Sequence, residues 1–277
     1  MAMIAFATNS LLCRAALTQT SIDAASFTFI RMFSGAVALW LIVNLRRTTG
    51  GVCDRRGGNW ISALALFLYA AAFSFAYVGV GAGTGALLLF GAVQATMILW
   101  GLHKGEHLRG VQTLGLIVAL IGLVLLLFPG LSAPPLSGSI LMIGAGVAWG
   151  IYSLRGRREK NPATVTAGNF VRTVPFAAVV SIIFIPWLHL DLAGVTYAII
   201  SGAITSGLGY VIWYSALPSL KAASAATVQL SVPVLAASGG ILLLGEPLTL
   251  RYLLASVAIL GGIALVVLEK TRAYSDL

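Results

Sequence analysis

The stretch from Gly110 to Phe128, GVQTLGLIVALIGLVLLLF, is apolar except for Gln112 and Thr113 and contains no charged residue. A run of about 20 apolar residues can cross the hydrocarbon core of a bilayer as a helix. The whole chain has this character: of its 277 residues 59% are hydrophobic and 9% are charged, and the mean hydropathy is +0.98. Because soluble domains carry about 25% charged residues, the composition excludes a soluble enzyme, a disordered protein and a secreted disulfide scaffold. The sequence predicts a polytopic membrane protein.

Further apolar runs accompany this one, and together they define the predicted membrane spans. Helices are expected because a helix satisfies its own backbone groups in lipid. The many glycines and alanines in these runs favour close packing of one helix on another. We therefore predict an all-α membrane protein of ten transmembrane helices and no separate soluble domain, with spans at 2–19, 24–44, 60–79, 83–101, 109–128, 138–154, 164–187, 195–216, 222–243 and 250–268.

The net charge of +9 is distributed unevenly, and this predicts the orientation of the chain. On one side of the predicted membrane, the connecting segments hold Arg251 as their only basic residue. The other side holds Arg46, Arg47, Arg55, Arg56, Lys104, Arg109, Arg155, Arg157, Arg158, Lys160, Lys221, Lys270 and Arg272. Because cytoplasmic loops are enriched in basic residues, we expect a bacterial inner (plasma) membrane protein with both termini in the cytoplasm. The charge is then a topological signal, and no nucleic-acid partner is expected. We expect Cys13 and Cys53 to be reduced.

The two halves of the chain resemble each other. At an offset of 140 residues, Gly105-Glu106-His107-Leu108 corresponds to Gly245-Glu246-Pro247-Leu248. At an offset of 141 residues, Phe29-Ile30-Arg31 corresponds to Phe170-Val171-Arg172. An odd number of spans in each half inverts the second half, an arrangement typical of secondary transporters, whose substrate site lies near mid-membrane at the repeat interface. We predict two inverted five-helix repeats, residues 1–133 and 134–277.

Two motifs are similar to those of a known family. Leu244-Gly245-Glu246-Pro247-Leu248-Thr249 precedes the last predicted helix, and Ala148-Trp149-Gly150 lies in the sixth. In the first repeat, Thr8-Asn9-Ser10 stands where that family has its Trp-Gly element. These motifs resemble the EamA-type branch of the drug/metabolite transporter (DMT) superfamily, and most of all its YddG-type exporters of aromatic and other amino acids. The resemblance implies a bacterial inner-membrane exporter of small metabolites, with the fifth and tenth helices peripheral to a central cavity.

Three arginines fall within predicted spans, where ionisable side chains are costly and usually functional. Arg14 is near the outer end of its span, so we expect its side chain to reach the interface. Arg31 and Arg172 lie about two turns inside their helices at repeat-related positions. Either could bind a substrate carboxylate, because a guanidinium matches that group in two hydrogen bonds. The alternative is that each caps carbonyl groups of a neighbouring helix.

The other polar and aromatic residues near mid-membrane are candidates for a substrate cavity, because aromatic rings and amides can hold a zwitterion without burying net charge. Taken singly, each is explained equally well by an interhelical hydrogen bond or an interface anchor. Pro175 and Pro233 would interrupt helical hydrogen bonding and act either as hinges or as packing kinks. The predicted substrate-binding residues are Asn9, Ser10, Tyr77, Gln94, Trp149, Tyr152, Tyr210, Trp213, Tyr214 and Gln229.

No Asp or Glu lies within a predicted span. Proton-coupled pumps commonly relay protons through an intramembrane carboxylate or histidine, so facilitated diffusion down the substrate gradient, or a coupling of another kind, is favoured. The sequence shows no acid pair, metal-ligand cluster or nucleophile–base pair, which argues against an intramembrane enzyme, a metal site and a cofactor. We expect an alternating-access exporter of aromatic or neutral amino acids, with a small-molecule substrate and the lipid bilayer as partners, and compatible with a monomer. The alternatives are a transporter of drugs, purines or sugar metabolites, and a non-transporting membrane sensor or scaffold.

Overall fold

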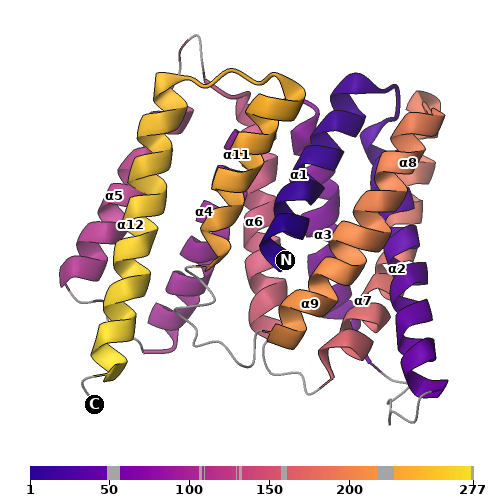
Figure 1. Cartoon of the computed structure of the whole chain (residues 1–277), viewed down its shortest axis with the longest axis horizontal. Coiled ribbons are helices and arrows are strands. Elements are labelled where there is room, and N and C mark those ends of the chain that lie inside the picture. The colour runs from indigo at the N-terminus through magenta and orange to yellow at the C-terminus, as the bar shows by residue number, and fades with distance from the viewer. Residues whose placement is uncertain are drawn as a thin grey trace.

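In the computed structural model, the described residues form a bundle of helices (Figure 1). These residues are 1–48, 57–105, 108, 110–128, 130, 133–156, 161–216 and 228–275. Most of the basic connecting segments, together with Cys53 and Glu106, lie outside them. The helices outside the eighth predicted span are α1 (Ala2–Gln19), α2 (Ala24–Thr48), α3 (Trp60–Tyr77), α4 (Ala82–His103), α5 (Gly110–Leu127), α6 (Leu136–Gly156), α7 (Pro162–Ile183), the short 3-10 helix η1 (Ile185–Trp187), α11 (Ser231–Leu244) and α12 (Leu250–Ser275). Most helix ends fall within a few residues of the predicted spans, but α11 begins at Ser231 where the span was predicted from 222, and α12 continues to Ser275 beyond the predicted 268; residues 217–227 lie outside the described part.

The eighth predicted span is an irregular helix. It consists of α8 (Leu192–Ile200), a π-helical segment η2 (Ser201–Leu208) and α9 (Gly209–Ala216). Such wide turns are rare and are frequently found at functional sites. Within η2, a Cβ added at Gly202 would collide with the backbone carbonyl of Arg31, so the small residue lets η2 lie directly against α2.

By length and composition, eight helical segments of the described ranges are suited to cross a membrane. The span at 192–216 counts as one of them. Helix α1 is not among the eight, and α11 is a shorter apolar helix of 14 residues. The fold is that of an all-helical, multi-pass membrane protein in the part of the chain that is described, while the count of ten spans and the two inverted repeats stay predictions.

Glycines allow the closest helix contacts. A Cβ at Gly150 on α6 would lie 2.9 Å from the Cβ of Thr96 on α4, and a Cβ at Gly115 on α5 would lie 2.6 Å from the carbonyl oxygen of Gly262 on α12. Small residues are the usual means by which helices approach in lipid. Helices α5 and α12 pack on each other at one edge of the bundle (left in Figure 1). The bundle centre therefore lies among the other helices.

The two ends of the bundle carry different polar side chains. Glu246 lies on the segment between α11 and α12, and we call this side the Glu246 end (top of Figure 1). Arg155 lies in the last turn of α6, and we call this side the Arg155 end. Gly245 ends α11 with a φ of +66°, a left-handed conformation that glycine adopts without steric cost. The backbone N–H of Glu246 then donates to the Gly240 carbonyl at 3.0 Å, which turns the segment back toward the bundle.

Candidate functional site

Arg31 on α2 is a charged side chain with an exposed fraction of 0%. Its Nε donates to the Ser206 Oγ and one terminal nitrogen donates to the Tyr69 hydroxyl, each at 3.2 Å. Its guanidinium carbon lies 4.8 Å from the ring centroid of Phe73, a distance typical of a cation–π contact. The other terminal nitrogen has no hydrogen-bond partner. Across the described residues the ion pair found joins Arg14 to Glu246, so Arg31 is a buried cation without an anion, which is a costly arrangement.

An aromatic cluster adjoins this arginine. The ring of Trp149 on α6 lies 4.9 Å from that of Tyr69 and 4.8 Å from that of Tyr210, measured between centroids. Phe6 on α1 packs edge-on against Trp149 at 6.0 Å and against Tyr210 at 5.8 Å. All four rings are buried. Tyr69 thus joins the cluster to Arg31, and residues from α1, α3, α6 and α9 meet at one place.

The π-helical segment is hydrogen-bonded to Asn9 on α1. The Asn9 Oδ1 accepts from the Ser201 Oγ at 2.7 Å and from the Thr205 Oγ1 at 3.0 Å. The Ser206 Oγ, which accepts from Arg31, lies 3.5 Å from the same oxygen. One network therefore links the buried arginine of α2 with α1 through hydroxyl groups of η2.

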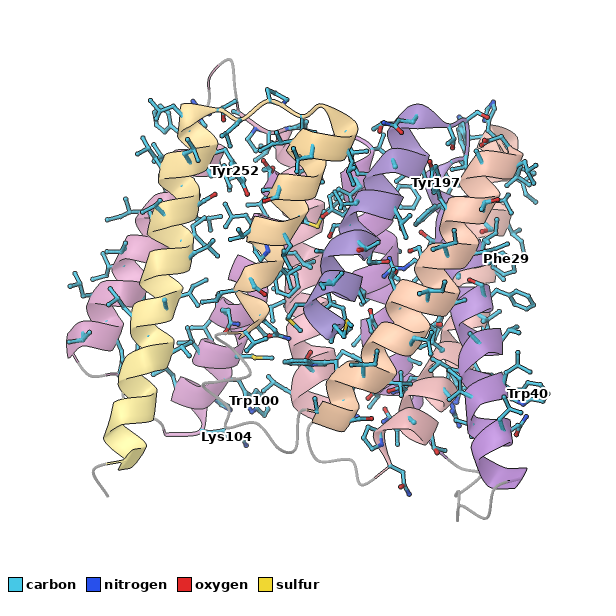
Figure 2. The ribbon with its side chains drawn as sticks, viewed as in Figure 1. Phe29, Trp40, Trp100, Lys104, Tyr197 and Tyr252 are labelled. Carbon is cyan, nitrogen blue, oxygen red and sulfur yellow. The ribbon has the colours of Figure 1, made fainter. Side chains whose placement is uncertain are left out.

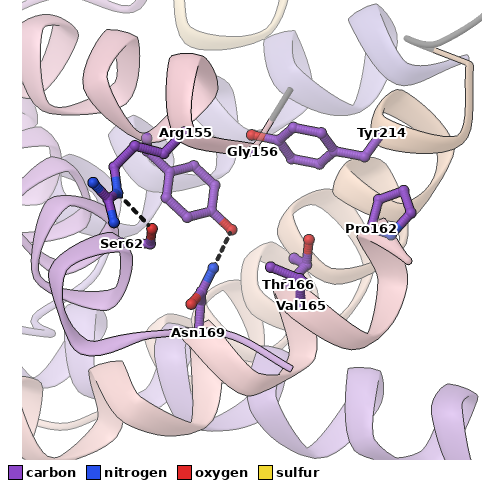
Figure 3. A pocket seen from close by; sticks show the side chains of 9 residues that line it. Ser62, Arg155, Gly156, Pro162, Val165, Thr166, Asn169 and Tyr214 are labelled. Atoms are coloured by element: carbon purple, nitrogen blue, oxygen red, sulfur yellow. Dashed lines mark hydrogen bonds between the residues drawn. The ribbon is translucent and has the colours of Figure 1, made fainter. Parts of the chain in front are cut away.

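A small pocket lies on the Arg155 side of the aromatic cluster (Figure 3). It is bounded by Tyr152 and Tyr214, whose ring centroids are 6.1 Å apart. The Arg155 Nε donates to the Ser62 Oγ at 2.9 Å, and the Asn169 Nδ2 donates to the Tyr152 hydroxyl at 3.4 Å. The free volume is about 10 Å³, roughly the space of one water molecule. A metabolite could enter only if the helices move apart.

At the Glu246 end, an ion pair joins α1 to the segment before α12. The Arg14 Nε lies 3.2 Å from the Glu246 Oε1, and its Nη1 donates to the carbonyls of Tyr77 and Val78 at 2.8 and 3.0 Å. Both oxygens of Glu246 accept from the backbone N–H of Ala82, at 2.9 and 2.8 Å. The carboxylate therefore caps the N-terminus of α4, where negative charge is favoured. We call this contact the Arg14–Glu246 tie. The sequence predicted that the Arg14 side chain reaches the membrane interface, whereas the structure shows it bound to Glu246 and to two backbone carbonyls.

The remaining predicted substrate-binding residues are buried, each at most 4% exposed. Trp213 adjoins the aromatic cluster, where its ring lies edge-on to that of Phe6 with centroids 6.1 Å apart. Tyr77 lies at the end of α3 beside the tie, where its hydroxyl donates to the Ala82 carbonyl at 3.4 Å. Pro175 lies inside α7, and Pro233 lies in the first turn of α11, where a missing N–H costs no intrahelical bond. The other buried members are Ser10, Gln94 and Gln229.

The repeat-related arginines have different surroundings. Arg172 on α7 donates through Nη1 to the carbonyl of Gly57, which precedes α3, and to that of Gly168 in its own helix, at 2.9 and 2.8 Å. It binds backbone carbonyls, but neither belongs to a neighbouring helix. Arg31 makes side-chain contacts instead. The structure places Arg172 in an outer groove with Trp40, whereas Arg31 is buried.

Several residues of this site were not singled out from the sequence. Tyr69 and Phe73 precede Tyr77 at intervals of four residues, a spacing that places all three on one helix face; this signal was available. Ser206 carries no comparable signal, because its position beside Arg31 depends on the π-helical turn.

Comparison with known proteins agrees with this architecture. Residues 136–268 match the EamA-like transporter family. The chain is 58% identical to the uncharacterized protein PA1977 of Pseudomonas aeruginosa over 96% of this chain and 92% of that protein. It is 34% identical to the threonine/homoserine exporter RhtA of Escherichia coli, over 56% of this chain and 54% of RhtA. It is 24% identical to the uncharacterized transporter YoaV of Bacillus subtilis over 86% of this chain and 85% of that protein.

A solved crystal structure superposes with a TM-score of 0.66 over 97% of this chain and 98% of the other. At 20% sequence identity this likeness supports the fold alone. The chain belongs to the EamA-like family of the drug/metabolite transporter superfamily. It is therefore a multi-pass membrane transporter, and its family and named relatives are transporters rather than enzymes.

Proposed function

We propose that this transporter exports small metabolites that carry a carboxylate, and amino acids in particular. The observation that carries the proposal is Arg31, which is completely buried, has one unpaired terminal nitrogen and faces no carboxylate among the described residues. A substrate carboxylate would supply the missing anion and match the guanidinium in two hydrogen bonds. The partial likeness to RhtA, a threonine/homoserine exporter, favours amino acids as the class.

The aromatic cluster would hold the rest of such a substrate. Trp149, Tyr69 and Tyr210 offer ring faces close to Arg31. Aromatic faces attract an ammonium group and also accept an apolar side chain, so they suit a zwitterion with an aromatic or neutral side chain. The Oδ1 of Asn9 accepts from Ser201 and Thr205 and so helps to hold η2 where Ser206 meets Arg31.

The proposed transport cycle is alternating access: the pocket at the Arg155 end is too small for a metabolite in this structure, and the larger hollow at the Glu246 end, of about 390 Å³, is lined by Arg14 and Glu246 themselves. The Arg14–Glu246 tie closes the Glu246 end by joining α1, α4 and the segment before α12. The pocket at the Arg155 end adjoins the aromatic cluster through Tyr152, which lies 5.6 Å from Trp149. Substrate would enter at the Arg155 end, which the basic residues of the sequence make cytoplasmic, and leave after the tie breaks. Pro175 and Pro233 remain the proposed hinges.

The test is exchange of labelled amino acids, including threonine and an aromatic amino acid, by purified protein in liposomes. We expect exchange by the natural protein, a loss of about tenfold or more for Arg31→Gln, since a hydrogen bond to a charged group is worth about 1.5–3 kcal/mol, and partial activity for Arg31→Lys. The matched control is Arg251→Gln, which also replaces an arginine but lies in the first turn of α12, outside the central site. If Arg31→Gln exchanges amino acids at the natural rate, the carboxylate assignment is wrong; if the natural protein exchanges none, another substrate class or a non-transporting role must replace the proposal.

A further inference from the structure

A groove opens on the outer surface of the bundle toward the Arg155 end. It has a volume of about 580 Å³ and lies between α2, the start of α3 and the first half of α7. Trp40 and Trp60 line its sides, and each is 57% exposed. Figure 2 shows Trp40 pointing away from the bundle. We call this feature the Arg172 groove, because that arginine is the charged side chain among its described lining residues.

The position of Arg172 is fixed by backbone contacts. Its Nη1 donates to the carbonyls of Gly57 and Gly168. A Cβ added at Gly168 would collide with the Gly57 carbonyl, so these two backbones touch and hold the arginine between them. For the Nε and the second terminal nitrogen, no hydrogen bond to a described residue is found, and none of the described carboxylates pairs with the guanidinium there. This edge of the guanidinium therefore has donors to offer an anion beyond its contacts with the described residues.

The surroundings of this free edge match a phospholipid. Indole rings favour the interface between headgroups and hydrocarbon, and two of them flank the groove. Val171, which is 50% exposed, and Pro175 form an apolar wall beyond the arginine, suited to an acyl chain. Asn44 adds a polar side chain beside the tryptophans. Basic pockets of this kind between transmembrane helices bind anionic headgroups.

The local sequence adds positive charge. In the sequence, the segment between Asn44 and Gly57 carries Arg46, Arg47, Arg55 and Arg56 together with Asp54, a net charge of +3, and its residues 49–56 lie outside the described part of the structure. An anionic headgroup is attracted by such a cluster at about 1 kcal/mol per basic residue, whereas a zwitterionic headgroup is not. The positive charge of this segment therefore favours anionic lipids over zwitterionic ones.

We propose that the Arg172 groove binds an anionic phospholipid. The lipid phosphate accepts hydrogen bonds from the free edge of Arg172, and one acyl chain lies along α7 over Val171 and Pro175. The bound lipid contacts α2, α3 and α7, three helices that pack on one another. This inference is independent of the proposed substrate, because it uses none of the residues of the central site.

Native mass spectrometry of the purified protein tests the inference. The protein is incubated with phosphatidylglycerol or with phosphatidylcholine of identical acyl chains, and the retained lipid is counted. We expect the natural protein to retain phosphatidylglycerol in preference, Arg172→Gln to weaken that retention roughly fivefold, and Arg251→Gln to leave it unchanged. Equal retention of the two lipids by the natural protein, or an Arg172→Gln protein that behaves as the natural one, overturns the proposal.

Two further arms keep the test decisive. Val171→Trp fills the space along the apolar wall and leaves Arg172 in place, so this variant should also lose phosphatidylglycerol. It replaces Arg172→Gln in the test if that protein does not fold. Unchanged retention by Val171→Trp would refute the assigned path of the acyl chain. Thermal stability in detergent with inorganic phosphate alone distinguishes a lipid from a free anion. We expect stabilisation by phosphatidylglycerol and none by inorganic phosphate, and equal stabilisation by both would show a simple anion site.

Discussion

The Arg14–Glu246 tie predicts how readily the Glu246 end opens. We consider Glu246→Gln, which keeps the size of the side chain and an oxygen for the backbone N–H of Ala82 but removes the charge. The side chains of Arg14 and Glu246 are 19% and 18% exposed. Their hydrogen bond therefore lies between an exposed ion pair, worth about 0–1 kcal/mol, and a buried charge-assisted bond, worth about 1.5–3 kcal/mol. A carboxylate at a helix N-terminus adds about 0.3–1 kcal/mol. The substitution should cost the closed state about 1.5 kcal/mol, which raises the open population roughly tenfold.

The native Cys13 provides the assay. It is 0% exposed and directly precedes Arg14 on α1, so it reacts only when this end opens. In a Cys53→Ser background in detergent, the rate of Cys13 labelling by a polar thiol reagent should rise about tenfold for Glu246→Gln. Arg251→Gln, which removes a partly exposed arginine at the same end that bonds to the Phe128 carbonyl and not to Arg14 or Glu246, should leave the rate unchanged. Arg14→Gln should raise it, and the double variant should show less than the sum of the two effects, because the residues share one interaction. Unchanged Cys13 labelling in a folded Glu246→Gln protein, or strictly additive effects, would refute the tie as a closing contact.

Three other predictions follow from the site and its surroundings. Trp149→Ala should abolish both amino-acid exchange and the rise in melting temperature that a bound ligand produces, whereas Trp149→Phe, which keeps a π-face, should retain part of each; full exchange by Trp149→Ala would leave Trp149 as core packing. Exchange in liposomes should persist without a pH gradient, because Asp23, Asp191 and Glu246 all lie at or beyond helix ends among the described carboxylates; a strict requirement for the gradient would contradict this. The backbone N–H of Gly194 donates to Asp191 and lowers the pKa of that carboxyl. The cap that Asp191 forms on α8 therefore stabilises the fold above the ordinary aspartate pKa, and this stabilisation is lost as the pH falls through the lowered pKa. Thermal unfolding of Asp191→Ala should show a smaller loss of stability on acidification than the natural protein, and identical pH profiles would exclude this cap.

The positions of the helices could be predicted from the sequence because a chain that crosses lipid has few possible backbone conformations. A long apolar run must form a helix to satisfy its backbone, so the observed ends of α1, α5 and α9 fall at or next to those predicted. The π-helical segment was not predicted. Its wide turns depend on contacts of Ser201 and Thr205 with Asn9, far away in the sequence, and apolar periodicity carries no information about such contacts.

The candidate site was predicted only in part, for a related reason. Burial of Trp149 and Tyr210 follows from their place in apolar spans, but their contact depends on how α6 and α9 cross. The repeat correspondence of Arg31 and Arg172 suggested a shared role, yet one is enclosed by Tyr69 and Ser206 and the other lines an outer groove. Sequence similarity between the repeats predicts where each arginine lies along its helix, but it does not predict which helices pack against that arginine. The likeness of Glu246 to Glu106 likewise gave no sign that Arg14 would be its partner.

The most direct measurement of the central claim is counterflow by the purified natural protein in liposomes, comparing an amino acid with its own carboxamide. Threonine and threonine amide differ in the carboxylate that Arg31 is proposed to bind, while their side chains are the same. We predict that liposomes loaded with unlabelled threonine accumulate labelled threonine, that threonine amide neither drives nor competes for this exchange, and that Arg31→Gln removes the distinction. Equal competition by threonine and its amide in the natural protein, or exchange that survives in Arg31→Gln, would contradict the account.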